Sequence, residues 1–437
     1  MRRYHFLLSL ILTIVWTPSG AQSQQNAGTL TDDGAWCWFS DPRAILTSDK
    51  RLVTGWVKKD GSVEAAQMDL TNYSIQTKVL YDQLEVDDHD NPAFAELPSG
   101  EILCMYTWHG SKDGILWQKT DRMGNIQSFS KPVVIRPGIE TLLPNYPRET
   151  YTYANPYYLS GEKTTYSFGR WIGYKPDWIK STDGGETWGE ETVIISRQPF
   201  DPGNRPYVKY SSDGKSKIHL VFTDGHPRVE PLNSVYHCYY ENDAFWRSDG
   251  SRICTVDELP FDPKEATVVY RASSDSGRAW LADIGLGEDG TPYVLYTRHP
   301  EETDHRYHYS WYSTQEDTWI DYEICKAGRW FPQTPPGEEE REQHYHGNLT
   351  IHPSRPDVIF LSRQINGRFE IEKRITADGG KTWDITPVTT NSEYDQVRPY
   401  IPRNTDKNDP TLVLWMENKE YVHYTDFDCR IRYWLDH

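Results

Sequence analysis

Short runs of β-branched and aromatic residues, separated by Gly, Pro, Asp and Asn, recur along most of the chain. Clear examples are residues 102–106, 218–222, 293–296 and 412–415. Such short runs between turn-forming residues are typical of β-strands. No long stretch has the apolar spacing of an amphipathic helix. The pattern predicts an all-β protein built from many short strands.

A turn sequence repeats between these runs. Residues 181–188 (STDGGETW) fit the pattern S-x-D-x-G-x-T-W, and residues 376–383 (TADGGKTW) fit it with Thr for Ser. Residues 273–280 (SSDSGRAW) form a looser third copy, and Lys119-Thr120-Asp121 with Gly124 forms a decayed fourth. In this Asp-box turn, Asp accepts backbone N–H bonds, Gly adopts positive φ and Trp packs beneath the hairpin. The motif predicts hairpins and carries no catalytic information.

The spacing of the turns indicates a β-propeller. A propeller blade takes about 40–50 residues, so the intervals between Asp183, Asp275 and Asp378 correspond to two blades each. Six or seven blades fit the length, and seven is favoured. The last strands, near residues 430–434, are predicted to share a blade with an N-terminal strand and so close the ring. No linker interrupts residues 22–437, which are predicted to be a single propeller domain.

The first residues have the pattern of an export signal. Arg2 and Arg3 precede an apolar run over 6–16, and Ser19-Gly20-Ala21 offers small residues for cleavage. We therefore expect residues 1–21 to be a signal peptide. The run is too short to span a bilayer, and no Cys follows directly for lipid attachment. The expected location is secreted or periplasmic, without membrane insertion.

The amino-acid composition restricts the classes of ligand that the protein is expected to bind. Aromatic residues make up 14% of the chain, with 17 Trp and 29 Tyr, which argues against disorder and suits stacking on sugars. The formal net charge of −18 argues against nucleic acid as a partner. An anionic glycan would need a locally basic pocket on an acidic protein.

The cysteines and several histidines raise two structural questions. Six cysteines allow 15 disulfide pairings, among which the sequence does not choose. A structural zinc site is a second hypothesis, because imidazole and thiolate are zinc ligands. His226 can alternatively line a substrate cleft, and His344 with His346 can be a second metal site, a subsite or a solvated loop. The zinc hypothesis uses His226, His237, Cys238 and Cys254.

Polar clusters that could carry chemistry lie within the strand-rich regions. They are residues 86–92 (VDDHDNP), 106–110 (YTWHG), 151–156 with 167–171, and the segment from Asn204 and Arg205 through 224–227 to 233–237. Three segments, 34–43 (GAWCWFSDPR), 88–92 and 223–227 (TDGHP), resemble the BNR-repeat propeller proteins of polysaccharide-degrading bacteria. That group includes propeller ulvan lyases and enzymes that cleave between rhamnose and glucuronate.

The resemblance covers nearly the whole mature chain and implies a seven-bladed propeller that cleaves an anionic, uronic-acid-containing polysaccharide by β-elimination. Rhamnose-linked glucuronate, as in ulvan or arabinogalactan side chains, is the favoured substrate. Elimination removes the proton at C5 and expels the group on O4. It therefore needs a neutralised carboxylate, a base and an acid, and no cofactor.

The resemblance also implies roles for individual residues. His89 and His109 match its paired histidines, Tyr153 its catalytic Tyr, and Arg170 its carboxylate-binding Arg. Arg170 and a protonated histidine are expected to lower the pKa of Tyr153. Substrate contacts are further expected from Asn91, Arg205 and a second Tyr, for which Tyr207 and Tyr210, as well as Tyr151, remain open.

Two other functions compete with elimination. Related propellers hydrolyse rhamnose–glucuronate bonds with a histidine early in the chain, on the opposite face of the propeller. Here no His lies between His5 and His89, which counts against hydrolysis. A sialidase is less favoured still, because the chain shows no recognisable motifs for the arginine triad and the Tyr/Glu pair that a sialidase needs. A non-catalytic glycan-binding propeller suits the aromatic content equally well, although binding alone does not require the His/Tyr/Arg set.

Overall fold

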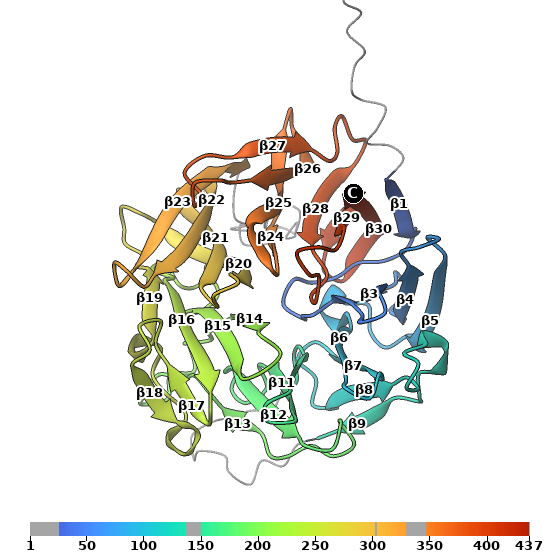
Figure 1. Cartoon of the computed structure of the whole chain (residues 1–437), viewed down its shortest axis with the longest axis horizontal. Helices are drawn as coiled ribbons and strands as arrows, with labels where there is room; N and C mark the ends of the chain where they lie inside the picture. The colour runs from blue at the N-terminus through green and yellow to red at the C-terminus, as the bar shows by residue number, and fades with distance from the viewer. Residues whose placement is uncertain (1–25, 137–149, 302–303, 329–346, 437) are drawn as a thin grey trace, which may run out of the picture.

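The computed structural model describes residues 26–136, 150–301, 304–328 and 347–436. Within these ranges the chain forms seven small antiparallel sheets arranged around a central axis (Figure 1). The predicted all-β, seven-bladed propeller is confirmed. The expected signal peptide and the pair His344/His346 lie outside the described residues. None of the described helices has the length and apolar character needed to cross a membrane.

Each of the first three blades has four strands, given from the axis outward. Blade 1 contains β2 (Ala44–Leu46), β3 (Arg51–Val57), β4 (Val63–Asp69) and β5 (Ile75–Tyr81). Blade 2 contains β6 (Ala93–Glu96), β7 (Ile102–Thr107), β8 (Ile115–Lys119) and β9 (Val133–Ile135). Blade 3 contains β10 (Asn155–Leu159), β11 (Thr164–Gly169), β12 (Asp177–Ser181) and β13 (Thr192–Val193).

Blade 4 is larger than its neighbours. It contains β14 (Val208–Ser212), β15 (Lys217–Thr223), β16 (Val235–Glu241), β17 (Ala244–Trp246) and β18 (Arg252–Thr255), and β19 (Thr267–Tyr270) also pairs with β16. Blade 5 contains β20 (Arg278–Leu286), β21 (Pro292–Glu301), β22 (Asp304–Ser313) and β23 (Thr318–Gly328). Blade 6 contains β24 (Leu349–His352), β25 (Arg355–Ile365), β26 (Arg368–Ile375) and β27 (Asp384–Pro387).

Blade 7 closes the ring. It contains β28 (Asp395–Tyr400), β29 (Thr411–His423) and β30 (Asp426–Asp436), and its outermost strand is β1 (Ala27–Thr31). Gly28 pairs with Tyr433, as the sequence predicted for the two ends of the chain. A Cβ atom on Gly28 would lie 2.4 Å from the Tyr433 ring, so a larger residue at this position would have to displace that ring. Short 3₁₀ turns connect the strands: η2 (Asp88–Asp90), η3 (Ile126–Ser128), η4 (Val256–Glu258) and η5 (Pro263–Glu265).

The hydrophobic core lies between neighbouring blades. Along β7, Ile102, Cys104 and Tyr106 pack in a cluster with Val53 and Phe94 of blades 1 and 2. The alternate residues, Leu103 and Met105, pack on the other side in a cluster that includes Trp171 beside blade 3. Successive side chains of a strand point to opposite faces, and both faces of a blade are covered. The predicted strands are therefore apolar runs rather than alternating ones.

Two of the predicted Asp-box turns have the expected hydrogen bonds. Between β26 and β27, Asp378 accepts from the Thr382 amide (2.9 Å) and hydroxyl (2.7 Å), and Trp383 donates to the Gly380 carbonyl (3.2 Å). The Asp183 turn between β12 and β13 repeats these contacts. The decayed copy at Asp121 lies at the matching connection in blade 2, between β8 and β9, and accepts from two backbone amides.

The third copy, residues 273–280, is not such a turn. It joins β19 to β20 between two blades, and Trp280 lies inside strand β20. There Trp280 is fully buried in an aromatic cluster with Phe39, Tyr153 and Tyr207. The motif match misled here because four matching positions do not fix the place of the turn within a blade.

All six cysteines are free thiols. Five are buried, and Cys325 is partly exposed. Cys238 and Cys254 belong to the same core cluster of blade 4, so they act there as small apolar side chains.

We predict that Asp378→Ala lowers the urea midpoint of unfolding, because several hydrogen bonds to one carboxylate are lost. Asp275→Ala is the matched control, since Asp275 belongs to the copy that does not form the turn. Its substitution should change the free energy of unfolding by less than about 0.5 kcal/mol. Urea unfolding of both variants checks this, and equal losses would contradict the assignment.

Candidate functional site

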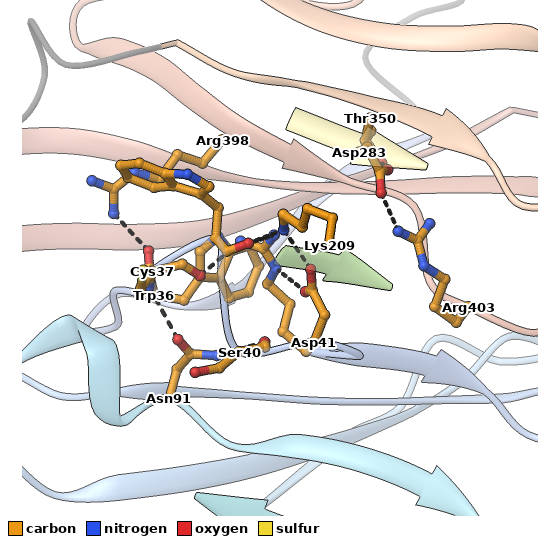
Figure 2. A network of polar contacts seen from close by, with 12 residues as sticks. Trp36, Cys37, Ser40, Asp41, Asn91, Lys209, Asp283, Thr350, Arg398 and Arg403 are labelled. Atoms are coloured by element: carbon orange, nitrogen blue, oxygen red, sulfur yellow. Dashed lines mark hydrogen bonds and ion pairs between the residues drawn. The ribbon is translucent and has the colours of Figure 1, made fainter. Parts of the chain in front are cut away.

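The site is built on the segment that precedes β2 and passes close to the propeller axis. Asp41 is fully buried there and accepts from Arg43 Nε (3.0 Å) and Lys209 Nζ (2.5 Å). Although burial raises its pKa, the charges of Arg43, Lys209 and Arg403 lower the pKa of Asp41 to about 2. Figure 2 shows this pair beside a second one, in which Arg403 contacts Asp283. The ion pairs fix where the segment crosses the axis.

The same segment is tied to the turn that carries His89. Asn91 accepts from the Cys37 amide (3.1 Å) and donates to the Ser40 carbonyl (3.4 Å), as Figure 2 shows. Ser40 in turn donates to the His89 carbonyl (3.3 Å). The Asn91 side chain is fully buried, and both ends of its amide serve the backbone. The Asn91 side chain therefore holds the backbone of this segment in place and is not available for the predicted contact with substrate.

His89 and His109 lie face to face. Their ring centroids are 4.0 Å apart and the rings are tilted by only 8°. Asp87 holds both: its Oδ1 lies 2.7 Å from His89 Nδ1 and its Oδ2 lies 2.8 Å from His109 Nδ1. The Tyr424 ring packs edge-on against both imidazoles. The sequence predicted the pair and missed the carboxylate that joins it.

The two imidazoles differ in their proton affinity. Burial lowers the pKa of His89, but the charge of Asp87 and its hydrogen bond to the ring act in the opposite direction, and the pKa lies well above the usual value. Burial and the neighbouring His89 lower the pKa of His109. At neutral pH, His89 is therefore a cation and His109 is neutral.

A second carboxylate also contacts His89. Asp88 Oδ1 lies 3.0 Å from His89 Nδ1. The other oxygen of Asp88 accepts from Arg398 (2.7 Å) and from the Tyr421 hydroxyl. Asp88 and Arg398 are both buried. Because buried charges are stable only when paired, Arg398 keeps Asp88 ionised beside His89.

Tyr153 completes this side of the site. Its side chain is 4% exposed, its ring lies 5.9 Å from His89 and 5.8 Å from Phe39, and its φ is +66°. Burial raises the pKa of Tyr153 far above the usual value, although His89 and Arg170 act in the opposite direction. The expected lowering of this pKa is wrong, because desolvation of a phenolate outweighs both cations. The free protein holds Tyr153 protonated.

A cavity of about 440 Å³ opens beside these residues. Arg170 stacks over Tyr207 at 3.7 Å, and its Nε donates to the Pro206 carbonyl (3.1 Å). Arg205 lies over the Tyr174 ring at 4.4 Å. No carboxylate of the described residues lines the cavity. Its wall consists of His109, Gly110, Thr152, Arg170, Tyr174, Arg205, Tyr207, His226, Arg228 and Val229.

The structure separates the tyrosine alternatives. Tyr207 lines the cavity and touches Phe39 and Trp280. Tyr210 packs on Phe168 in the core between blades, with ring centroids 4.4 Å apart, and so is not available to a ligand. Tyr151 is fully buried in another core cluster. Of the three, Tyr207 alone occupies the place expected for a second tyrosine.

The zinc site predicted from His226, His237, Cys238 and Cys254 is not formed. No three of these side chains bring their ligand atoms within 4.8 Å of one another. His237 instead contacts His219 (3.0 Å) and Ser248 (2.8 Å). Adjacent residues of strand β16 face opposite sides, so Cys238 points into the core. His226 lies in the cavity, 4.9 Å from Trp280 between ring centroids.

Asp87, His89 and His109 do bring their ligand atoms within 4.8 Å of one another, but their orientation does not suit a metal ion. A metal lies in the plane of each imidazole that binds it, at about 2.0–2.1 Å. The two rings are nearly parallel and stacked, so their Nδ1 lone pairs do not converge on one point. Hydrogen bonding to Asp87 accounts for the arrangement.

Three consecutive blades supply the site in the same way. His89, Tyr153 and Tyr207 each precede the innermost strand of a blade, β6, β10 or β14. His109, Arg170 and His226 each follow the second strand, β7, β11 or β15. In an antiparallel hairpin, the start of one strand and the end of the next lie at the same edge. All six side chains therefore gather at one mouth of the propeller.

These features define a seven-bladed propeller with a cationic cavity beside an Asp/His/His/Tyr cluster. The chain belongs to the BNR repeat-containing family, whose sequence model matches residues 53–327. A search of curated proteins gave no match.

Among solved structures, the chain is similar to an ulvan lyase of polysaccharide lyase family PL25. Identity is 13%, 92% of this chain and 94% of that chain are covered, and the TM-score is 0.66. The same type of enzyme bound to -[GlcA(1-4)Rha3S]- gives 12% identity, the same coverage and the same TM-score. The polysaccharide lyase Uly1 is 13% identical, with 91% and 89% covered and a TM-score of 0.58. At these identities the likeness shows a shared fold.

We predict that the protein loses stability as the pH falls from about 6.5 to 5, where free histidine takes up protons. Burial lowers the pKa values of several histidines, so the unfolded chain binds protons that the folded protein does not, and acid favours unfolding. His89, Asp90 and Asp177, whose pKa values are raised, act in the opposite direction but are fewer. A urea midpoint that stays constant or rises on acidification would contradict this. The histidines are His219, His226 and His305, at about 3, and His352, at about 4.

Proposed function

We propose that the protein is a polysaccharide lyase that cleaves a uronic-acid-containing glycan by β-elimination. The observation that carries the proposal is the charge of the cavity. A chain with a formal net charge of −18 lines this cavity with three arginines and two histidines and, within the described residues, with no carboxylate. Such a local reversal of charge favours an anionic ligand. The cavity adjoins groups suited to moving protons.

The chemistry begins with the uronate carboxylate. Arg170 Nη1 has no hydrogen-bond partner among the described residues, whereas Nε and Nη2 bind backbone carbonyls. A guanidinium held in this way offers a fixed donor to a carboxylate. His89, as a cation, adds positive charge close to Tyr153. Neutralising the carboxylate stabilises the negative charge that develops when C5 loses its proton.

The proton affinities assign the base and the acid. His109 is neutral, and its side chain is 29% exposed at the cavity wall, so its Nε2 can accept the C5 proton. Tyr153 keeps its proton and can donate it to O4 of the leaving sugar. The C5–H and C4–O4 bonds break, and a C4–C5 double bond forms. One proton enters the protein at His109 and one leaves from Tyr153, and solvent restores both groups.

The substrate class is a finer part of the proposal. One structure similar in fold is an ulvan lyase bound to -[GlcA(1-4)Rha3S]-. That likeness, with the family resemblance of the sequence, supports rhamnose-linked glucuronate, as in ulvan or arabinogalactan side chains. We further propose that the protein is exported, because residues 1–21 have the pattern of a signal peptide.

The direct test incubates the protein with ulvan, gum arabic and other uronic glycans and follows the ultraviolet absorbance of an unsaturated uronate. We expect a rise with at least one of them. In Tyr153→Phe the rate should fall by about 10²-fold or more, because the acid is removed while its ring is kept. Tyr158→Phe, remote from the cavity, is the control. Release of rhamnose without a double bond would indicate hydrolysis, and no product would favour a binding protein.

Arg170→Lys tests the carboxylate contact. Lys keeps the charge but loses the fixed planar donors, so kcat/KM should fall by about 10–100-fold, in line with a lost charged contact of about 2 kcal/mol. Arg247→Lys, on the β17–β18 turn and outside the cavity wall, is the control and should retain full activity. Steady-state kinetics check this, and an unchanged kcat/KM in Arg170→Lys would place the carboxylate elsewhere.

A further inference from the structure

We propose that Asp87 is the positioning residue of this site: one carboxylate holds both imidazoles and thereby fixes His89 as the cation and His109 as the neutral base. The catalytic part of this inference rests on the proposed function, and the protonation part does not. Asp87 is 3% exposed and lines no part of the cavity. It therefore acts through the histidines rather than on a ligand.

The geometry of Asp87 orients both rings. Its backbone position is the N-cap of η2, where its Oδ1 also accepts from the His89 amide (2.9 Å). A carboxylate only accepts hydrogen bonds, so each Nδ1 must carry a proton. His109 is then the Nδ1–H tautomer, and its Nε2 lone pair is left for the cavity. An imidazole presenting Nε2–H could not serve as a base there.

The groups around the stack decide which ring is charged. His89 Nδ1 lies within 3.0 Å of both Asp87 and Asp88, whereas His109 Nδ1 contacts Asp87 alone. Two imidazolium rings 4.0 Å apart would repel each other, so the site favours a single charge at rest. The other titratable groups facing the pair do not reverse this order. They are Cys37, Glu85, Asp90, Tyr153 and Tyr424.

Asp87 also matters during the reaction. When His109 takes the C5 proton, a second cation forms directly against His89. The shared carboxylate touches both rings and offsets that repulsion. Without its charge, His109 would be a weaker base and would hold its proton less tightly.

Asp87→Asn removes the charge and keeps the size. An amide has one acceptor oxygen and one NH₂ group, so only one of the two Nδ1–H groups keeps its partner. We expect kcat to fall by about 10²-fold, with KM changed by less than about threefold. The acidic limb of the pH profile of kcat/KM should move to lower pH, because the base becomes weaker. Asp113→Asn, an exposed carboxylate on the loop after His109, is the matched control.

A measurement on the free, unaltered protein keeps the inference testable even if Asp87→Asn does not fold. Nitrogen-15 NMR of labelled histidines, assigned with His89→Gln and His109→Gln, should show at neutral pH one imidazolium (His89) and one neutral Nδ1–H tautomer (His109). Two neutral rings, two charged rings or an Nε2–H tautomer of His109 would overturn it.

The outcomes separate the two proposals. An unaltered protein that forms no unsaturated product on any uronic glycan refutes the lyase function, while the NMR result still tests the protonation pattern. An active protein whose Asp87→Asn variant keeps its rate and its pH profile refutes the positioning role. Loss of rate with an unmoved pH profile would likewise contradict it, because that result indicates a merely structural effect.

Discussion

The site depends on one buried ion pair near the propeller axis, between Asp41 and Lys209. Lys209 comes from β14 of blade 4, whereas Asp41 precedes β2 of blade 1. Their contact ties distant parts of the ring to the segment that carries Cys37 and Ser40, which in turn braces the His89 turn. Removing one partner of a buried pair typically costs about 3–5 kcal/mol. A change there would displace the catalytic side chains as well as destabilise the fold.

The net charge of the whole chain and the charge of the cavity wall have opposite signs. The whole chain is acidic, yet the cavity wall is cationic. Beside it, buried carboxylates control the imidazoles: Asp88, kept ionised by Arg398, and Asp87 together retain a proton on His89. At Tyr153 it is desolvation, rather than a neighbouring charge, that raises the pKa and keeps the hydroxyl protonated. The same low-dielectric environment thus prepares a cation, a neutral base and a neutral acid within one cluster.

Much of the fold was predictable, because strand runs and Asp-box turns are local patterns. The ring closure, which pairs the two ends of the chain, follows from the propeller architecture that these patterns indicate. The predicted third turn failed, since Trp280 serves the site rather than a hairpin. For the site, resemblance pointed to His89, His109, Tyr153 and Arg170, and the structure brings them together. The choice of Tyr207 over Tyr210, the bracing role of Asn91 and the pairing of Asp87 with two rings depend on packing across blades. One usable signal in the sequence was missed. Each of the three contributing blades supplies one site residue just before its innermost strand and another just after its second strand.

The measurement that tests the central claim most directly is a crystal structure of the Tyr153→Phe variant with a uronic-acid oligosaccharide bound. The account predicts that the uronate carboxylate contacts Arg170, with C5 facing His109 Nε2 and O4 facing the ring of residue 153. A sugar bound instead at the opposite mouth, in the cavity of about 410 Å³ lined by Tyr158, Ser212 and Arg403, would contradict it.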